Sequence, residues 1–216
     1  MPTIAYKNKA GKSVKSQSSL KSNIGWGKGG LMYWANQQGL EGKTLQEAYD
    51  TSTIPGTIAH YLIECNLTNV EPDLKEYDSA DIKSARGAYK SFMVWRKQFE
   101  MKPLEVEPNW VSEKFQYGGT PDVIADISGE VCIVDWKTGH SAGKYPEIFI
   151  QLAAYSQLAY EHGYKIEGYH VLRVPRNDDN PSFAHFYWEK MPAKAWEAFL
   201  SAKKLGECES ELKKLL

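Results

Sequence analysis

The pattern of hydrophobic and polar positions divides the chain into a helical first half and a β-rich second half. Before Pro108, apolar side chains recur at helical spacing, as where Ile58, Tyr61 and Leu62 share one face. After Pro108, short runs rich in β-branched residues are separated by glycine-containing turns. The change of period predicts helices first and a sheet afterwards.

The helical pattern predicts segments that are separated by glycine, proline or charged residues. They cover residues 27–40, 45–49, 55–67, 79–101 and 146–161, with a last helix from Pro192. Thr57 is a candidate N-cap of the third. Residues 1–23 are polar and rich in serine and lysine, which predicts an extended arm or an irregular lead-in.

The second half contains five segments with strand character. They cover residues 110–117, 121–128, 130–137, 167–174 and 183–189. The third is nearly all apolar before its carboxylate, as expected of a strand that is buried on both faces. The order of elements predicts an α/β fold with one central mixed sheet flanked by helices.

Length and composition predict one globular domain over residues 1–216. Residues 1–108 form a mostly helical N-terminal portion with a basic lead-in, residues 109–190 the β-sheet core, and residues 191–216 a C-terminal helix. The chain is 42% hydrophobic and 25% charged, which argues against disorder. With 216 residues it can bury a sizeable core.

Cysteine content and hydropathy narrow the class of protein further. The three cysteines are far apart and form no C-x-x-C pair, so a disulfide framework, a zinc site and an iron–sulfur cluster are not expected. No apolar run is long enough to span a membrane, and the N-terminus lacks the apolar segment of a signal peptide. We therefore expect a cytoplasmic protein.

Charge is distributed unevenly, although the net charge is only -1. Residues 1–40 carry six lysines and no acidic residue, whereas residues 64–81 are mainly acidic. Lysines in such a segment can bind phosphate groups, which favours a nucleic-acid partner. The alternative is a solvated lysine-rich tail.

Two carboxylates in the β-rich half are placed to share a metal ion. Asp122 lies near the start of one predicted strand, and Asp135 lies near the end of the next. With a tight turn at Ser128-Gly129, an antiparallel hairpin pairs position 122 close to position 135. Mg²⁺ bound by such oxygens can activate water and neutralise phosphate charge. The hairpin therefore predicts a centre for phosphodiester hydrolysis.

Lys137 follows Asp135 by two positions, so both side chains point to the same face of the strand. An ammonium group there can orient the attacking water or stabilise charge in the transition state. The carbonyl of Trp136 is a candidate further metal ligand. The alternative is an ordinary Asp–Lys ion pair at a strand end.

Four sequence blocks resemble one nuclease family, in order and at similar spacing. The chain resembles the RecB-like branch of the PD-(D/E)XK nuclease superfamily, which includes mitochondrial genome maintenance exonucleases and many phage exonucleases. The blocks span residues 56–155, nearly half of the chain. They read Gly56-Thr57-x-x-His60-x-x-x-Glu64, Gly119-x-x-Asp122 (preceded by Glu113), Asp135-x-Lys137-Thr138, and Gln151-x-x-x-Tyr155.

The resemblance implies a restriction-endonuclease-like core and a set of site residues. Asp122 and Asp135 would be the main metal ligands, with His60 as a further ligand, and Lys137 would be the catalytic lysine. The cofactor would be one or two Mg²⁺ or Mn²⁺ ions, with no iron–sulfur cluster. Two further pairs of residues are implied. Gln151 and Tyr155 would face the site, where they contact substrate phosphate or position Lys137, and Glu64 and Glu113 would be accessory residues.

Two of these assignments have a plain structural alternative. A lone histidine such as His60 is commonly hydrogen-bonded to the backbone without any catalytic part. Tyr155 also belongs to an apolar stripe with Leu152 and Leu158, which would make it an aromatic residue at the edge of the core.

The sequence therefore predicts a metal-dependent DNA nuclease, most readily an exonuclease that acts on linear ends in phage recombination, replication or repair. Such a protein would work in the bacterial host cytoplasm, beside a phage recombinase or a single-strand-binding protein. Lys21, Trp26, Lys28 and Thr138 are candidate DNA-binding residues. The alternatives are a structure-specific or restriction-type endonuclease, and a catalytically silent DNA-binding protein of the same fold.

Overall fold

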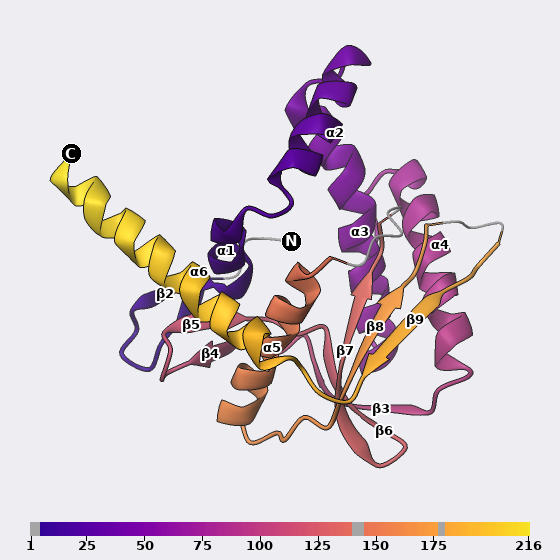
Figure 1. Ribbon diagram of the computed structural model, residues 1–216. Helices are drawn as coiled ribbons and strands as arrows, with labels where there is room; N and C mark the ends of the chain where they lie inside the picture. The colour runs from indigo at the N-terminus through magenta and orange to yellow at the C-terminus, as the bar shows by residue number, and fades with distance from the viewer. Residues whose placement is uncertain (1–4, 140–144, 177–179) are drawn as a thin grey trace.

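The computed structural model describes residues 5–139, 145–176 and 180–216. A five-stranded mixed sheet forms its centre, in the order β3-β6-β7-β8-β9 (Figure 1). The α/β class with a mixed central sheet flanked by helices is confirmed. The strands are β3 (Met101–Val106), β6 (Val123–Ile127), β7 (Glu130–Lys137), β8 (Gly168–Arg173) and β9 (Ala184–Trp188).

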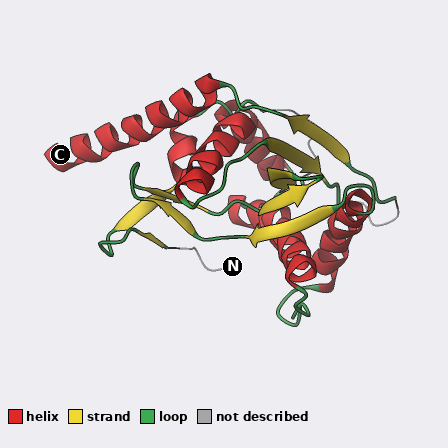
Figure 2. Ribbon diagram, turned by 90° about the horizontal axis from the view of Figure 1, so that it is seen from below, coloured by secondary structure: helices red, strands yellow, loops and turns green. Residues whose placement is uncertain are grey.

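Helices cover both faces of this sheet, as the view from below shows (Figure 2). Those with the largest buried faces are α3 and α4 on one face and α5 on the other. The helices are α1 (Gln17–Lys21), α2 (Lys28–Leu40), α3 (Leu45–Thr68), α4 (Ser79–Arg96), α5 (Glu147–Glu161) and α6 (Ala193–Leu212), with 3-10 turns at Ser22–Ile24 and Lys213–Leu215.

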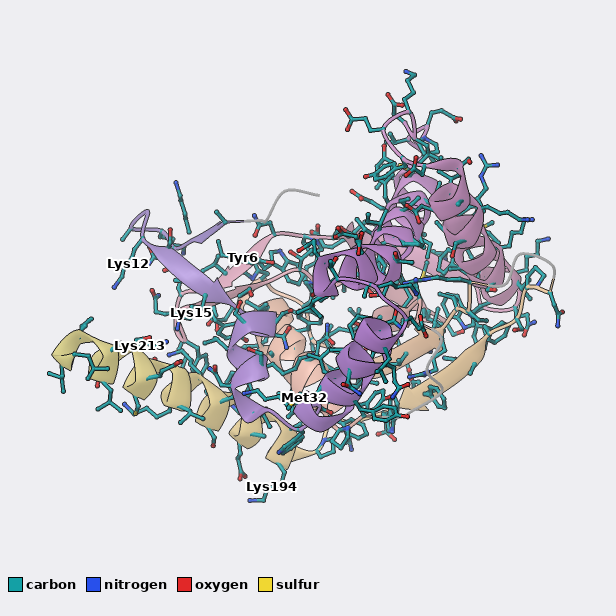
Figure 3. All side chains as sticks on the ribbon, turned by 90° about the horizontal axis from the view of Figure 1, so that it is seen from above. Tyr6, Lys12, Lys15, Met32, Lys194 and Lys213 are labelled. Atoms are coloured by element: carbon teal, nitrogen blue, oxygen red, sulfur yellow. The ribbon has the colours of Figure 1, made fainter. Side chains whose placement is uncertain are left out.

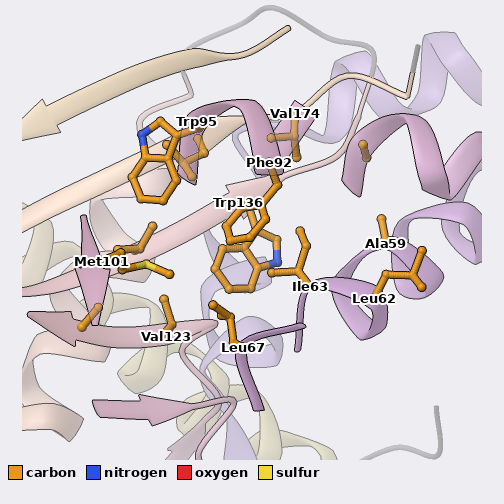
Figure 4. Close-up of a cluster of buried hydrophobic side chains, with 14 of the residues drawn as sticks. Ala59, Leu62, Ile63, Leu67, Phe92, Trp95, Met101, Val123, Trp136 and Val174 are labelled. Atoms are coloured by element: carbon orange, nitrogen blue, oxygen red, sulfur yellow. The ribbon is translucent and has the colours of Figure 1, made fainter. Parts of the chain in front are cut away.

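The alternation of side chains along β7 builds two hydrophobic cores. Cys132, Val134 and Trp136 pack against α3 and α4, whereas Ile133 packs against α5. In the first core the ring of Trp136 lies among Phe92 and other apolar side chains (Figure 4). Because β7 is buried on both faces, the nearly continuous apolar pattern of its sequence is explained.

The β6–β7 hairpin has the register that its turn residues predict. Ser128 and Gly129 both have positive φ, at 57° and 90°, as a two-residue type I′ hairpin turn requires. Val123 pairs with Val134, and the same register places position 122 opposite position 135. Strand β8 then pairs in parallel with β7 after the α5 crossover.

The lead-in is part of the domain, so the prediction of an arm over residues 1–23 is wrong for the described part. β1 (Tyr6–Lys7), β2 (Ser13–Ser16), β4 (Trp110–Ser112) and β5 (Tyr117–Gly119) form a second, smaller sheet. Short polar strands carry little sequence signal, because they are stabilised by pairing with distant strands. The predicted strand over residues 110–117 is likewise two strands of this sheet, joined by a turn in which Gln116 has a φ of 54°.

Helices α3 and α4 differ from the prediction. The segments 45–49 and 55–67 are one helix, α3, with Pro55 inside it and a capping box between Thr44 and Glu47 at its start. Helix α4 ends at Arg96, and the chain enters β3 at Met101. Strand β3 escapes the sequence pattern because it lies at the sheet edge, contains Pro103 and has an irregular register.

Among the described residues, no helix is both long and apolar enough to cross a membrane. Helix α2 projects beyond one end of the central sheet, and α6 extends away from the sheet to the C-terminus (Figure 1).

Candidate active site

The predicted site residues gather at the end of the β6–β7 hairpin, where both helical layers meet the sheet. Asp135 and Lys137 have the same strand parity as Ile133 and therefore face α5. Trp136 faces the opposite layer, toward α3. The site thus draws side chains from both faces of the sheet, and α3 and α5 supply the partners of the hairpin.

Asp135 and Lys137 form an ion pair in which the carboxylate is buried and the lysine is partly exposed. Lys137 Nζ lies 3.0 Å from Asp135 Oδ1 and 2.7 Å from Oδ2. Burial by itself would lower the pKa of Lys137, but Asp135 and Asp122 outweigh it and raise that pKa above its ordinary value. Lys137 is therefore protonated and positively charged at neutral pH. The pair is not an exposed contact at a strand end, since Asp135 is 1% exposed.

Helix α5 continues the site through a chain of polar contacts. Lys137 Nζ donates to Gln151 Oε1 at 3.1 Å, and Gln151 Nε2 donates to the Tyr155 hydroxyl at 3.1 Å. The four-residue spacing of Gln151 and Tyr155 puts both on one face of α5. Tyr155 also packs in the second core, as its place in the apolar stripe suggested.

His60 reaches the site from α3, and its ring is bonded to side chains, with no hydrogen bond to the backbone of the described residues. Its Nδ1 accepts a hydrogen bond from Trp136 Nε1 at 3.0 Å and lies 3.4 Å from Asp122 Oδ1. The backbone N–H of Trp136 donates to the other oxygen, Asp122 Oδ2, at 2.9 Å. Burial tends to lower the pKa of His60, but Asp122 raises it more strongly. Trp136 thus holds both His60 and Asp122 in place.

Glu107 completes a group of ligand atoms that the sequence did not suggest. One donor atom each from His60, Glu107 and Asp122 lies within 4.8 Å of the others. Burial, Asp122 and Glu64 raise the pKa of Glu107 to about 7. A cation among these groups would remove the repulsion between the carboxylates. Two carboxylates and an imidazole form a donor set that suits Mn²⁺ and also Mg²⁺, so the residues present fit the predicted cofactor.

The position of Glu107 is set by the tertiary structure. It follows β3 with a φ of 43°, and its N–H donates to the carbonyl of Asp122. This contact turns the chain beside the β6 strand and brings the Glu107 side chain close to His60 and Asp122. The only sequence signal was an acidic residue ahead of Pro108, which marks a loop without marking a site.

Four other predicted residues lie at different distances from this group. Thr138 is 7% exposed and lies beside the ligand group, and Trp26 is 58% exposed at the cleft edge. Glu64 is near enough to raise the pKa of Glu107 but is not part of the ligand group. Glu113 lies at the β4–β5 turn, where it accepts a hydrogen bond from the N–H of Lys9.

Two clefts meet at this site. The larger, of about 990 Å³, is lined by Asp135, Lys137 and Gln151, by Lys21 and Trp26 from the lead-in, and by other residues. The smaller, of about 560 Å³, lies on the side of Glu107. His60, Asp122 and Thr138 line both. Lys28 packs beside Gly25, and it is not among the residues that line the larger cleft.

Comparisons with known proteins give weak likenesses. No family model and no curated protein matches the sequence. Solved structures that align include LHK-Exo in complex with dAMP (TM-score 0.45, 13% identity, 74% of this chain and 82% of that chain). The alkaline exonuclease LHK-Exo from Laribacter hongkongensis aligns with a TM-score of 0.44 and 13% identity, over 74% of this chain and 82% of that chain. SSO0001 aligns with a TM-score of 0.37 and 16% identity, over 73% of this chain and 71% of that chain. We therefore take the function from the geometry of the site.

Proposed function

We propose that this chain is a nuclease of the PD-(D/E)XK superfamily, of its RecB-like branch, that hydrolyses DNA with the help of Mg²⁺ or Mn²⁺. One observation carries the proposal. His60 and Asp122 of the ligand group line the same cleft as the Asp135–Lys137 pair and Gln151, and Glu107 lines the smaller cleft that meets it at His60 and Asp122. Carboxylates, an imidazole and a lysine in one cleft are the parts that phosphodiester hydrolysis requires.

His60, Asp122 and Glu107 would hold the first cation, and Asp135 with the carbonyl of Trp136 would complete its ligands or hold a second. When bound, the cation supplies water activation and neutralises charge on the phosphate. Lys137 stays charged beside Asp135 and is placed to orient a phosphate oxygen or the attacking water. Gln151 fixes the direction of the Lys137 ammonium group, and Tyr155 fixes Gln151.

The larger cleft would admit the DNA strand. Trp26 is exposed at its edge, where its ring is available for stacking on a base. Lys21 and Thr138, which line this cleft, would contact phosphates there, and Lys28 would contact a phosphate outside the cleft. We propose an exonuclease acting on linear ends during phage recombination, replication or repair, with a recombinase or single-strand-binding protein as partner.

The proposal is tested with end-labelled DNA, linear and circular, single- and double-stranded, in Mg²⁺ and in Mn²⁺. We expect cleavage of linear substrates that EDTA abolishes and that Asp135→Ala or Lys137→Ala lowers by at least about 100-fold. Asp126→Asn is the matched control, because Asp126 caps the hairpin turn outside both clefts.

Two other outcomes identify the alternatives. Cleavage of closed circles would show a structure-specific or restriction-type endonuclease. DNA binding without cleavage in either cation would show a silent binding protein of this fold.

A further inference from the structure

Lys21 is held in the active site by the folded lead-in. It ends α1, whose first turn is capped by Ser16, and Ser16 belongs to the β2 strand that pairs in parallel with β5. The neighbouring Leu20 is 3% exposed and packs in the second core. Just beyond, Asn23 donates to the carbonyl of Ala202 at 3.0 Å. Lys21 is therefore anchored on both sides, and it lines the larger cleft.

Lys21 and Lys137 share one hydrogen-bond acceptor. Lys21 Nζ lies 3.4 Å from Gln151 Oε1, the same oxygen that Lys137 Nζ contacts at 3.1 Å. Lys137 is neutralised by Asp135, whereas no carboxylate among the described residues forms an ion pair with Lys21. A partly buried ammonium group without a counter-ion, beside a second ammonium group, is unfavourable unless a ligand or a reaction uses it.

The position of Lys21 suits proton exchange with a group bound in the cleft. Its Nζ lies beside the shared Gln151 oxygen, and its side chain lines the larger cleft. Burial and the charge of Lys137 lower the pKa of Lys21, and they outweigh Asp135 and Glu147, which raise it.

We propose that Lys21 is a second catalytic lysine, which donates a proton to the oxygen that leaves phosphorus when the DNA strand is cut. This inference rests on the proposed nuclease function. As the water oxygen forms its bond to phosphorus, the bond to the leaving oxygen breaks and its electron pair stays on that oxygen. The oxygen takes a proton from Lys21 Nζ and departs as a hydroxyl group, and the neutral amine regains a proton from solvent. The attacking water gives its own proton to solvent.

Sulfur substitution at the leaving atom tests this role. Short DNA substrates carry one sulfur in place of the bridging O3′ or, in a second set, the bridging O5′. A thiolate leaves without protonation. Loss of the acid therefore has no effect on the substrate whose sulfur replaces the leaving oxygen. We expect Lys21→Met to cut the oxygen substrate about 100-fold more slowly than the wild type. It should cut one sulfur substrate within about fivefold of the wild-type rate.

Matched variants separate proton donation from charge and from folding. Lys21→Arg keeps the charge but cannot give up a proton at neutral pH, so it should also be slow on oxygen and recover on sulfur. Lys137→Met should be slow on both substrates. Lys15→Ala is the control with wild-type rates, because Lys15 points to Ser210 on the α6 side of the lead-in (Figure 3). Melting temperatures verify that each variant is folded.

The outcomes are distinct. Equal losses of Lys21→Met on oxygen and sulfur, or a wild-type rate of Lys21→Arg on oxygen, would overturn the acid role. Failure of the wild type to cut any of these substrates would instead contradict the proposed nuclease function.

Discussion

The indole nitrogen of Trp136 donates a hydrogen bond to Nδ1 of His60 at 3.0 Å, across the buried side of β7. Trp136 stands between Asp135 and Lys137 in sequence but points to the opposite face of the strand. Its ring is fully buried against α3 and α4 while its N–H reaches a site residue. Trp136 thus connects the hydrophobic core to His60 and Asp122, two of the candidate metal ligands.

Trp136→Phe should free His60 from this donor. Nδ1 would then be available to carry a proton toward Asp122, so we expect the pKa of His60 to rise above its wild-type value, as measured by NMR titration. We also expect a loss of about 2 kcal/mol in the free energy of unfolding, from the cavity and the lost hydrogen bond. Trp95→Phe is the control, since Trp95 is equally buried but its Nε1 has no hydrogen-bond partner in the described part of the chain. A His60 pKa unchanged in Trp136→Phe would contradict the prediction.

The two halves of the Asp135–Lys137 pair should not be equivalent for stability. The Asp135 side chain is 2% exposed and that of Lys137 is 31% exposed. Lys137→Ala leaves a buried carboxylate without its partner and should cost about 3 kcal/mol, whereas the ammonium group left by Asp135→Ala can turn toward water and should cost less. Urea unfolding in EDTA measures both. Equal losses, or a larger loss for Asp135→Ala, would contradict the greater burial of the Asp135 carboxylate.

Glu107→Gln should weaken binding of Mn²⁺ by roughly 10- to 100-fold, a typical effect of changing a group at a metal site. Isothermal titration calorimetry measures it, and Glu64→Gln is expected to have a smaller effect because Glu64 lies outside the ligand group. Without metal the variant should be more stable than the wild type at pH 8. The folded-state pKa of about 7 is above the unfolded one, so Glu107 destabilises the fold increasingly as pH rises from about 4.5 to 7. Unchanged Mn²⁺ affinity would show that Glu107 is not a metal ligand.

Gly119→Ala should disturb the Tyr155 end of the polar chain. A Cβ at position 119 would lie 2.8 Å from Leu158 Cδ1 and 3.1 Å from Tyr155 Cε1. We expect a loss of about 1–3 kcal/mol in stability from overpacking and about a tenfold slower cleavage from the displaced chain. Gly39→Ala on α2 meets no atom within 4 Å and should leave cleavage unchanged. Wild-type cleavage by folded Gly119→Ala would show that the position of Tyr155 is not important.

Stability should fall in mild acid because of a buried histidine pair. His170 Nδ1 lies 2.8 Å from His185 Nε2, and burial with the charge of His185 lowers the pKa of His170 to about 4. The unfolded chain binds protons near pH 6.5 that the folded chain does not, so stability is present above about 6.5 and declines toward pH 4, by roughly 2 kcal/mol. Urea unfolding between pH 4 and 8 measures the decline. His170→Phe should flatten it, and an unchanged slope in that variant would assign the decline to other groups.

Local sequence signals predicted the parts of the fold that depend on local geometry. The Ser128-Gly129 turn fixed the hairpin register, and the register placed Asp122 opposite Asp135. The four-residue spacing of Gln151 and Tyr155 likewise placed them on one helix face. Short edge strands and the course of α3 through Pro55 could not be predicted in this way, because their stability comes from contacts with distant segments.

The sequence by itself determined the α/β class, the carboxylate hairpin and the two-residue step from Asp135 to Lys137, since each follows from strand period or turn chemistry. Only the tertiary structure decided that Glu107 joins His60 and Asp122, that Trp136 supports His60 and that Lys21 meets Gln151. The physical reason is the same in all three cases. Those contacts join segments from different layers of the fold, and their positions are set by packing across the whole domain. No local pattern in the sequence encodes that packing.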